Sequence, residues 1–413
     1  MRSERRRQVT RIVALLLLAS MVLPFLATQL ASPAEAVAVW HAYPEGTVQA
    51  DTIQAYVEAL ASSRPRVKVQ VRALGDQFGG ALVQGVGSGT FPDIILAPAE
   101  WVPLLDDIGL LAAVPADDLD QYLPGVAAAV SSEGRVRALP AFTAVLALGR
   151  RPATGGDDPV PWPDTLAAMI ADAGEAAGAG LGGLYWPVDD LYYTVPWLLG
   201  AGGYLEPPPD PSPGSPAGGA APPVADDAVR AWLRAVERAR AAAIPGSGDV
   251  DLVSAWLAGE IAFAAVTPGE VTVLRSSGAA IDVGPIPEAR GYLSTWAWML
   301  SAYAGEPRSD AIRLLARIQA ADGGEGPSLA LSVRQLPAMV WHFDEPASAE
   351  RGIDGFLSSA QSGIPMPAGP LARELWTIYE MALQEFLAGA KAETVLASLK
   401  NRTGELYAPD QEP

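Results

Sequence analysis

The apolar and polar positions that follow residue 36 change repeatedly between the period of a strand and the period of a helix. Val37–Trp40 is a short apolar run of strand length. After it comes a stripe at i, i+3, i+4 and i+7, which is typical of one face of a helix. That stripe consists of Ile53, Tyr56, Val57 and Leu60. Val67–Arg72 then alternates with period two and predicts a half-buried strand.

A second helix and a third strand complete this first unit. Phe78–Val86 predicts a helix, and Ile94–Ala97 is a continuous apolar run that predicts a strand buried on both faces. The order βαβαβ favours a largely parallel sheet. Glu100 and Trp101 come directly after the third strand, at the end where open α/β sheets bind their ligands.

The middle of the chain contains two further helix signals and one stretch that favours a loop. A helix is expected to begin near Asp164 or Thr165, either of which can serve as its N-cap. Leu184–Tyr204 resembles a segment of a known protein family that forms a helix with a Gly-Gly C-cap, so we expect such a helix here. The segment 206–224 is too rich in proline and glycine to pack into a core, so we expect a surface loop there.

Length and composition indicate an ordinary globular protein with room for two cores. The chain has 413 residues, of which 18% are charged and 50% hydrophobic. A net charge of −19 disfavours binding to nucleic acid or to an anionic membrane. The chain contains no cysteine, which excludes disulfides, thiolate metal sites and a lipid-modified cysteine anchor.

The amino terminus has the pattern of a secretory signal. Five arginines lie within the first eleven residues, the segment 12–27 is almost wholly apolar, and Ala34-Glu35-Ala36 has the small-x-small pattern of a cleavage site. We expect export to the periplasm or the extracellular space, with cleavage after Ala36. The alternative is that residues 1–36 remain as an N-terminal membrane anchor.

Pro92–Trp101 reads P-D-I-I-L-A-P-A-E-W, and Gly134–Pro140 reads G-R-V-R-A-L-P. These segments resemble the P-D-[IV]-x-x-x-x-x-[DE]-W motif and the G-K-x-Y-G-[LV]-P strand of extracellular solute-binding protein family 1, the sugar-binding subunits of ABC importers, which includes the maltose-binding proteins. Trp256–Phe263 is similar to its F-x-x-G-K-A-A-M segment. The resemblance covers roughly residues 37 to 400 and is weakest near the proline-rich stretch.

The resemblance implies a two-lobe α/β fold of the periplasmic-binding-protein type II, in which each lobe is a mostly parallel sheet flanked by helices and a cleft separates the lobes. Lobe one is expected to comprise residues 37–143 and 297–345. Lobe two is expected to comprise residues 144–296 and 346–413, with the loop 206–224 inside it.

The function implied by the resemblance is capture of a sugar or short oligosaccharide and its delivery to an ABC permease in the membrane by hinge closure. Flat aromatic rings suit the C–H faces of pyranoses, and carboxylates accept hydrogen bonds from sugar hydroxyls. We expect a monomer that is not an enzyme and that needs no cofactor and no metal. The candidate ligand-binding residues are His41, Tyr43, Glu100, Trp101, Asp190, Tyr192, Tyr193, Trp296, Trp298 and Trp376.

Each assignment has a packing alternative, and the sequence departs from the family in two places. Trp376 begins an apolar stripe that continues through Tyr379 and therefore also fits a helix core. Thr267–Glu270 stands where the family has G-P-W, and Ala144 stands where it has a glutamate. These departures put maltodextrin itself in doubt as the ligand.

Two other functions remain open from the sequence. Ferric-ion-binding members of the wider superfamily use two adjacent tyrosines with a histidine and a glutamate, and Tyr192, Tyr193, His41 and Glu100 supply such a set. Glu100 and Asp190 are also a conceivable carboxylate pair for glycoside hydrolysis. The sequence contains no nucleophile elbow, no H-E-x-x-H pair and no P-loop, which argues against catalysis.

Overall fold

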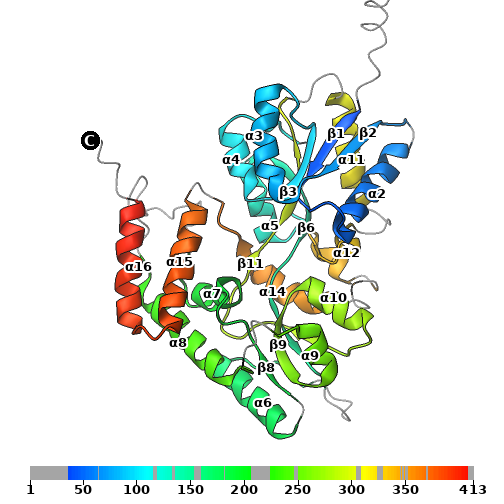
Figure 1. Cartoon of the computed structure of the whole chain (residues 1–413). Helices are drawn as coiled ribbons and strands as arrows, with labels where there is room; N and C mark the ends of the chain where they lie inside the picture. The colour runs from blue at the N-terminus through cyan, green and yellow to red at the C-terminus, as the bar shows by residue number, and fades with distance from the viewer. Residues whose placement is uncertain are drawn as a thin grey trace, which may run out of the picture.

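The computed structural model describes residues 36–407, apart from gaps at 64, 115–118, 133–134, 153–159, 181, 206–223, 246–249, 304–307, 323–328, 345, 347, 349–351 and 369–370. The expected signal or anchor segment (except Ala36) and the proline-rich loop (except Val224) lie outside the described residues. Within the described part of the chain, no helix combines the length and apolarity needed to cross a membrane. Two bodies, each built around a β-sheet, make up the molecule (Figure 1).

The first body contains a six-stranded sheet in the order β13-β6-β12-β3-β1-β2. Helices α2, α3, α4 and α11 surround it (Figure 1). The strands are β1 (Val37–His41), β2 (Val69–Ala73), β3 (Ile94–Pro98), β6 (Ala138–Thr143), β12 (Trp296–Leu300) and β13 (Leu336–Pro337). The helices are α2 (Val48–Ser62), α3 (Phe78–Ser88), α4 (Trp101–Asp107) and α11 (Arg308–Asp322).

The predicted βαβαβ unit is confirmed, because β1, α2, β2, α3 and β3 follow one another and β1 pairs in parallel with both β2 and β3. Helix α2 buries Ile53 and Val57 of the predicted stripe, and Thr47 caps its first turn by accepting from the N–H of Ala50. All of Ile94–Ala97 is buried, as a strand covered on both faces should be. Gly89 ends α3 in the left-handed region, at a φ of 71°.

The later strands make this sheet mixed, whereas the sequence predicts a mostly parallel one. Strand β12 runs antiparallel to both of its neighbours, β3 and β6, and β13 runs antiparallel to β6. The physical reason lies in the connectivity. The chain leaves this body at the carboxyl end of β6 and re-enters it at the same edge, so the returning strand must run in the opposite direction.

The second body is built on a four-stranded sheet in the order β10-β7-β9-β8. Only β8 and β9 are parallel, and β7 is antiparallel to both β9 and β10. Its strands are β7 (Ala147–Arg150), β8 (Gly183–Tyr185), β9 (Ile261–Val266) and β10 (Asp282–Gly284). Its helices include α6 (Leu166–Gly178), α7 (Leu191–Gly200), α8 (Asp226–Ala242), α9 (Leu252–Ala258) and α10 (Pro268–Ser276).

The expected helix boundaries in this body are close to those observed. Thr165 is the N-cap of α6, since its hydroxyl accepts from the N–H of Ala168. The helix expected within 184–204 is the shorter α7, preceded by β8. Gly202 and Gly203 close it, because their N–H groups donate to the carbonyls of Leu199 and Leu198.

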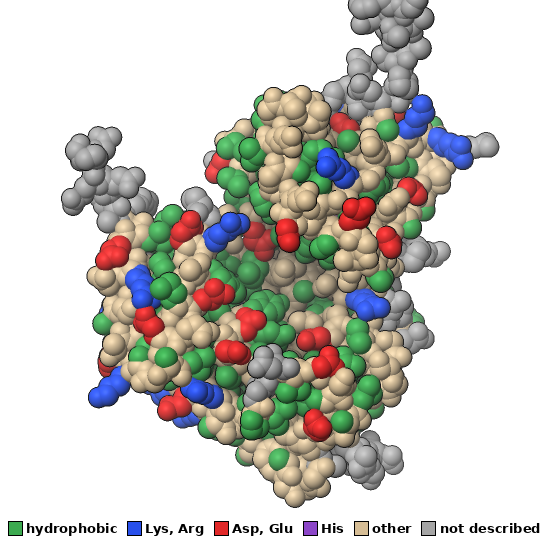
Figure 2. Space-filling model, in the orientation of Figure 1, with side chains coloured by type: hydrophobic (Ala, Val, Ile, Leu, Met, Phe, Trp, Pro, Cys, Tyr) green, Lys and Arg blue, Asp and Glu red, His purple; other side chains and the backbone are tan. Residues whose placement is uncertain are grey.

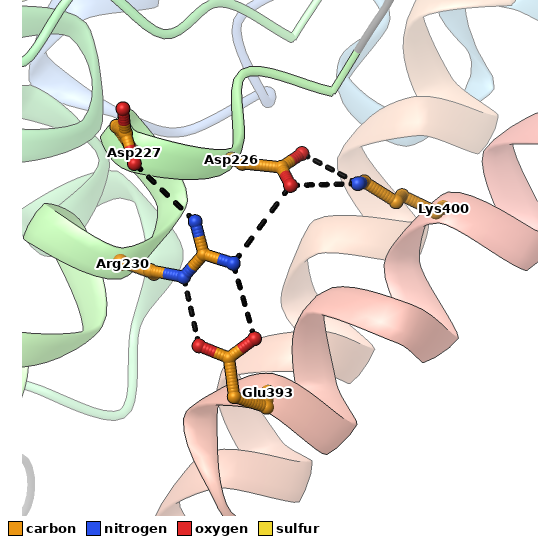
Figure 3. A network of polar contacts seen from close by, with 5 residues as sticks. All are labelled: Asp226, Asp227, Arg230, Glu393 and Lys400. Carbon is orange, nitrogen blue, oxygen red and sulfur yellow. Dashed lines mark hydrogen bonds and ion pairs between the residues drawn. The ribbon is translucent and has the colours of Figure 1, made fainter.

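The last two helices pack on the second body. Helices α15 (Ala372–Leu387) and α16 (Ala392–Leu406) contact each other, and α15 contacts α7 while α16 contacts α8. An exposed charge network joins α8 to α16 (Figure 3). Arg230 donates two hydrogen bonds to the carboxylate of Glu393, at 2.8 and 3.1 Å, and Lys400 pairs with Asp226 at 2.6 Å.

The remaining elements are short. They are η1 (Gly75–Gln77), α5 (Pro124–Ala129), β4 (Ser131–Ser132), β5 (Arg135–Val136), β11 (Tyr292–Leu293), α12 (Leu329–Ser332), η2 (Val340–Asp344), η3 (Asp354–Phe356), α14 (Leu357–Ser362) and β14 (Ile364–Pro365).

Candidate ligand-binding site

The chain crossing and the strand register bring the carboxyl ends of strands in the two sheets towards each other. Strand β6 ends at Thr143, and β7 begins the second sheet at Ala147, so only three residues separate the two sheets at this crossing. Because β1 and β3 run in the same direction as β6, their carboxyl ends lie at this edge. Ala147 pairs with Val266, which ends β9, so the carboxyl ends of β9 and β8 also face the crossing.

The surface is hollowed between the two bodies. Figure 2 shows hydrophobic side chains lining this hollow, with acidic side chains gathered around it on both bodies. Side chains at the two facing edges are therefore the candidates for contact with a ligand.

Aromatic rings form a stack at the edge of the first sheet. Tyr43, two residues beyond β1, stacks on Trp296 with ring centroids 4.2 Å apart and planes 20° apart. Phe142 is the register partner of Trp296 in the sheet, and the centroids of these two rings are 5.7 Å apart. Tyr43 and Trp296, both candidates from the sequence, are half-buried. Together they form an aromatic surface at this edge.

Glu100 follows β3 at the same edge, and its carboxylate is largely withdrawn from water. Its Oε2 atom is buried and has no hydrogen-bond partner among the described residues. This desolvation raises the pKa of Glu100 to about 7, partly opposed by a bond to its own backbone. A buried acceptor without a donor is costly, so the site favours a ligand that brings a donor to this oxygen.

His41 ends β1 beneath these residues and is 1% exposed. Its Nδ1 atom is buried and has no hydrogen-bond partner among the residues described. Burial lowers the pKa of His41 to about 4, so the imidazole is neutral at physiological pH. Its ring centroid lies 6.5 Å from that of Tyr43, which places it below the aromatic surface and not on it.

Two of the candidate tryptophans are used in packing. Trp298 is completely buried in the core between the first sheet and helices α2 and α11, although it lies on the same strand as Trp296. Two residues along a strand move a side chain by about 6.6 Å, so Trp296 lies at the edge and Trp298 lies inside. Trp101 packs its ring edge-to-face on Phe78 and over Gly79 of α3.

The candidates of the second body lie at the carboxyl end of β8. Asp190 is exposed and is the N-cap of α7, because its carboxylate accepts from the N–H of Tyr192 at 2.8 Å. Tyr192 and Tyr193 follow on the first turn, half-buried, with their rings edge-to-face at 5.8 Å. Desolvation raises the pKa of both phenols, so both are neutral.

Glu270 joins this cluster, although the sequence reasoning did not select it. It is the third residue of α10, after β9, and forms a capping box with Thr267. The charge of Glu270 contributes to the raised pKa of Tyr185, Tyr192 and Tyr193, so it lies near all three rings. The T-x-x-E pattern after a buried strand was the available sequence signal.

Trp376 lies on the first turns of α15 and is also half-buried. Its indole N–H donates to the carboxylate of Glu380 at 2.8 Å, and its ring lies 6.4 Å from that of Tyr292. Glu380 and Asp189 both raise the pKa of Asp190, after desolvation, the largest cause. Gln384 holds α15 to this region by donating to the carbonyl of Asp189.

The residues proposed for ferric ion come from both bodies, His41 and Glu100 from the first and Tyr192 and Tyr193 from the second. Among the described residues, no group of three or more His, Cys, Asp or Glu side chains is positioned to hold a metal ion.

The sequence matches no protein-family model and no curated protein, but the fold matches many solved structures. The sugar-binding protein MalE from Xanthomonas citri has a TM-score of 0.74 at 14% identity, over 92% of this chain and 100% of that chain. A cyclo/maltodextrin-binding protein in complex with maltotetraose has a TM-score of 0.71 at 17% identity, over 92% and 100%. The cyclic α-maltosyl-1,6-maltose-binding protein from Arthrobacter globiformis has a TM-score of 0.71 at 19% identity, over 90% and 99%. The chain therefore has the two-lobe α/β fold found in these sugar-binding proteins.

Proposed function

We propose that this protein is the extracytoplasmic solute-binding subunit of an ABC importer and that it binds a sugar or short oligosaccharide between its two lobes. The observation that carries the proposal is the composition of the two facing sheet edges. Stacked rings and a buried, unpartnered carboxylate oxygen lie at one edge, and tyrosines, a tryptophan and carboxylates lie at the other. Rings accept the C–H face of a sugar, and carboxylates accept its hydroxyls.

The fold supports this proposal because solved proteins that share it are described as bound to maltotetraose, maltotriose and maltose. We take lobe one as residues 37–143 and 297–345, and lobe two as residues 144–296 and 346–413. Within the site, Tyr43, Trp296, Tyr192, Tyr193 and Trp376 would supply rings. Glu100 and Asp190 would accept hydroxyls, and Glu270 and Glu380 join them.

His41, Trp101 and Trp298 have supporting places in this proposal. His41 and Trp298 are buried beneath the first edge, and Trp101 packs α4 against α3. They would fix the positions of the residues that touch the ligand.

The proposed mechanism is hinge closure. A ligand that contacts both edges binds the closed form more tightly than the open form, and this difference in affinity shifts the population towards closure. The closed form would be the one that the permease recognises, and the signal or anchor segment would keep the protein on the outer side of the membrane.

A sugar panel tests the proposal directly. We expect at least one sugar to raise the melting temperature and to bind in calorimetry, because a ligand that binds only the folded state stabilises it. Small-angle scattering should then show a smaller radius of gyration with the sugar present. The Trp296→Ala variant should lose most of the affinity, and Tyr303→Ala, an exposed ring outside the site, should keep it.

The same samples distinguish the competing functions. Ferric ion bound by tyrosinate gives a visible charge-transfer absorbance, whereas sugar binding is colourless. A glycoside hydrolase would release reducing ends from the bound oligosaccharide, and the proposed binding protein would return it intact. Colour with ferric ion, or turnover that Glu100→Gln abolishes, would replace the transport function.

A further inference from the structure

We infer that the ligand of this site is a sugar that carries a protonated amine. This inference rests on the proposed function and narrows its substrate class. It is drawn from the chemistry of both edges, at which carboxylates are interleaved with aromatic rings.

Hydrogen bonds hold the carboxylates of the second body beside its rings. Asp190 accepts from the N–H of Tyr192, and Glu380 accepts from the indole N–H of Trp376. Gln384, one turn after Glu380, donates to the carbonyl of Asp189 and so brings the two groups together.

The negative charges of Glu380 and Asp189 contribute to the raised pKa of Asp190. The negative charge of Glu270 contributes to the raised pKa of three tyrosine phenols. Neighbouring negative charges raise the pKa of Asp190 and of both Tyr192 and Tyr193, and no lysine or arginine opposes them among the described residues. A neutral sugar would donate hydrogen bonds to these oxygens but would not reduce the repulsion between the carboxylates. An ammonium group would donate hydrogen bonds and would also reduce that repulsion.

The aromatic rings of the second body also favour a cationic ligand. The faces of tryptophan and tyrosine attract cations, and the half-buried rings of Trp376, Tyr192 and Tyr193 lie beside these carboxylates. Two basic residues lie near the set and form no ion pair with its carboxylates in the described part of the chain. Arg373 is exposed one turn before Trp376, and Arg334, whose carbonyl oxygen lies 3.9 Å from the Cβ position of Gly269, forms no ion pair with Glu270.

The first edge supplies an independent observation. Oε2 of Glu100 is buried with no partner among the described residues and therefore lacks a donor. An ammonium group has three donors, which allows it to bond to a carboxylate at one edge while a sugar hydroxyl bonds at the other. Figure 2 shows acidic side chains around the hollow on both bodies, where they would attract a cation, and also Lys or Arg side chains on its rim.

Three substitutions remove the charge and keep the structural role of each side chain. Asp190→Asn retains an N-cap, because asparagine caps as well as aspartate does. Glu270→Gln retains the capping box, in which glutamine is an accepted residue. Glu380→Gln retains an oxygen acceptor for the indole N–H of Trp376. A matched control carries Glu175→Gln and Glu237→Gln, on the exposed faces of α6 and α8.

The test is calorimetry on the full chain with paired probes at about pH 7.5, which is above the pKa of Glu100, about 7, and below the ordinary pKa of such amines. The pairs are glucose with glucosamine, galactose with galactosamine, and cellobiose with the fully deacetylated disaccharide of chitosan. We expect the amine to bind at least about tenfold more tightly in one pair, and its affinity to fall at ~0.5 M salt. The triple amide variant should lose this preference, and the control should keep it.

The outcomes separate the two proposals. If a neutral sugar binds as tightly as its amine partner, or if the triple variant keeps the preference, the amine inference is wrong and the sugar-binding function stands. If no sugar of either kind binds while ferric ion does, both proposals fail. N-acetylated partners of the same amines serve as a further arm, since they keep the nitrogen and lose the charge.

Discussion

Ala144 and Ser294 exchange two backbone hydrogen bonds, with the N–H of Ala144 donating to the carbonyl of Ser294 at 3.0 Å and the N–H of Ser294 donating back at 2.9 Å. These residues come from the first two chain crossings, by which the chain first enters and then leaves the second body. Beside them, the hydroxyls of Thr143 and Thr295 are buried 3.3 Å apart. The two crossings therefore form one hydrogen-bonded ribbon and must bend together.

Because of this hydrogen-bonded ribbon, we expect substitution of Ser294 by proline to affect both sugar affinity and stability. Ser294→Pro removes the N–H that donates to Ala144 and fixes φ at this point, so we expect lower sugar affinity and a lower melting temperature. Ser294→Ala keeps the N–H and is the matched control, for which both properties should stay near those of the unsubstituted protein. Calorimetry and thermal unfolding measure the two effects. A proline variant that closes normally by small-angle scattering would refute a coupled hinge.

Trp376 is predicted to affect affinity more than stability. The ring is half-buried and beside the proposed ligand position, so Trp376→Ala should weaken sugar binding about tenfold, equivalent to ~1.4 kcal/mol. Isothermal titration gives the affinity, and chemical denaturation gives the stability. Equal binding by Trp376→Ala and the unsubstituted protein would remove this ring from the site.

Trp298 is predicted to affect stability more than affinity. Its side chain is completely buried, so Trp298→Ala should lower the free energy of unfolding by about 3–5 kcal/mol. Urea denaturation measures this loss. The affinity of the molecules that remain folded should change less than it does for Trp296→Ala, whose ring lies at the edge. A variant that is as stable as the original protein would contradict the burial of Trp298.

Glu100 and His41 are predicted to give opposite pH dependences of stability. The pKa of Glu100 is raised from 4.5 to about 7, so the folded state holds a proton that the unfolded state has lost between these values. Its contribution to the free energy of unfolding falls as pH rises through that window, by up to about 1.4 kcal/mol per unit. The pKa of His41 is lowered from 6.5 to about 4, so its contribution rises with pH between about 4 and 6.5.

Because the two windows overlap, the effects are seen best in separate variants. From pH 4.5 to 6.5, His41→Gln should become less stable with rising pH and Glu100→Gln more stable, relative to one another. Denaturation midpoints across this range provide the measurement. Parallel curves for the two variants would show that one or both assignments are wrong.

The charge network of Figure 3 is predicted to hold α16 against α8. Arg230→Met keeps a long apolar stem but removes the bonds to Glu393 and Asp227, so amide exchange in residues 392–406 should become faster. The difference should shrink at high salt, because these groups are partly or fully exposed and are therefore screened. Arg238→Met on the same helix is the control, and equal exchange in both variants would remove the network as the cause.

The sequence predicted local structure well where one period held for a whole element. The stripe containing Ile53 and Val57 and the apolar run Ile94–Ala97 were enough to predict α2 and β3. The direction of β12 was not predictable from its own residues, because it follows from where the chain re-enters the first body. The mostly parallel sheets expected from the resemblance are therefore mixed.

In the candidate site, too, local sequence predicts some features, whereas others depend on long-range packing. Glu100 is identifiable from the sequence as a strand-end residue, and Trp296 and Trp298 as two rings on one face of a strand. Periodicity does not report which of the two rings lies at the end of the strand and which lies in the core. Glu270 was read as a departure from a family motif. Its place beside the tyrosines depends on how β9 lies next to β8, which is a long-range pairing.

The position of β12 also has a consequence for how the polypeptide acquires its structure. This strand, at residues 296–300, fills the gap between β3 and β6 in the middle of the first sheet. An amino-terminal fragment that stops at Thr143 would leave two unpaired strand edges and tend to aggregate. Maturation of the first half must therefore wait until about 150 intervening residues have been made, which predicts slow, non-local folding of the whole polypeptide.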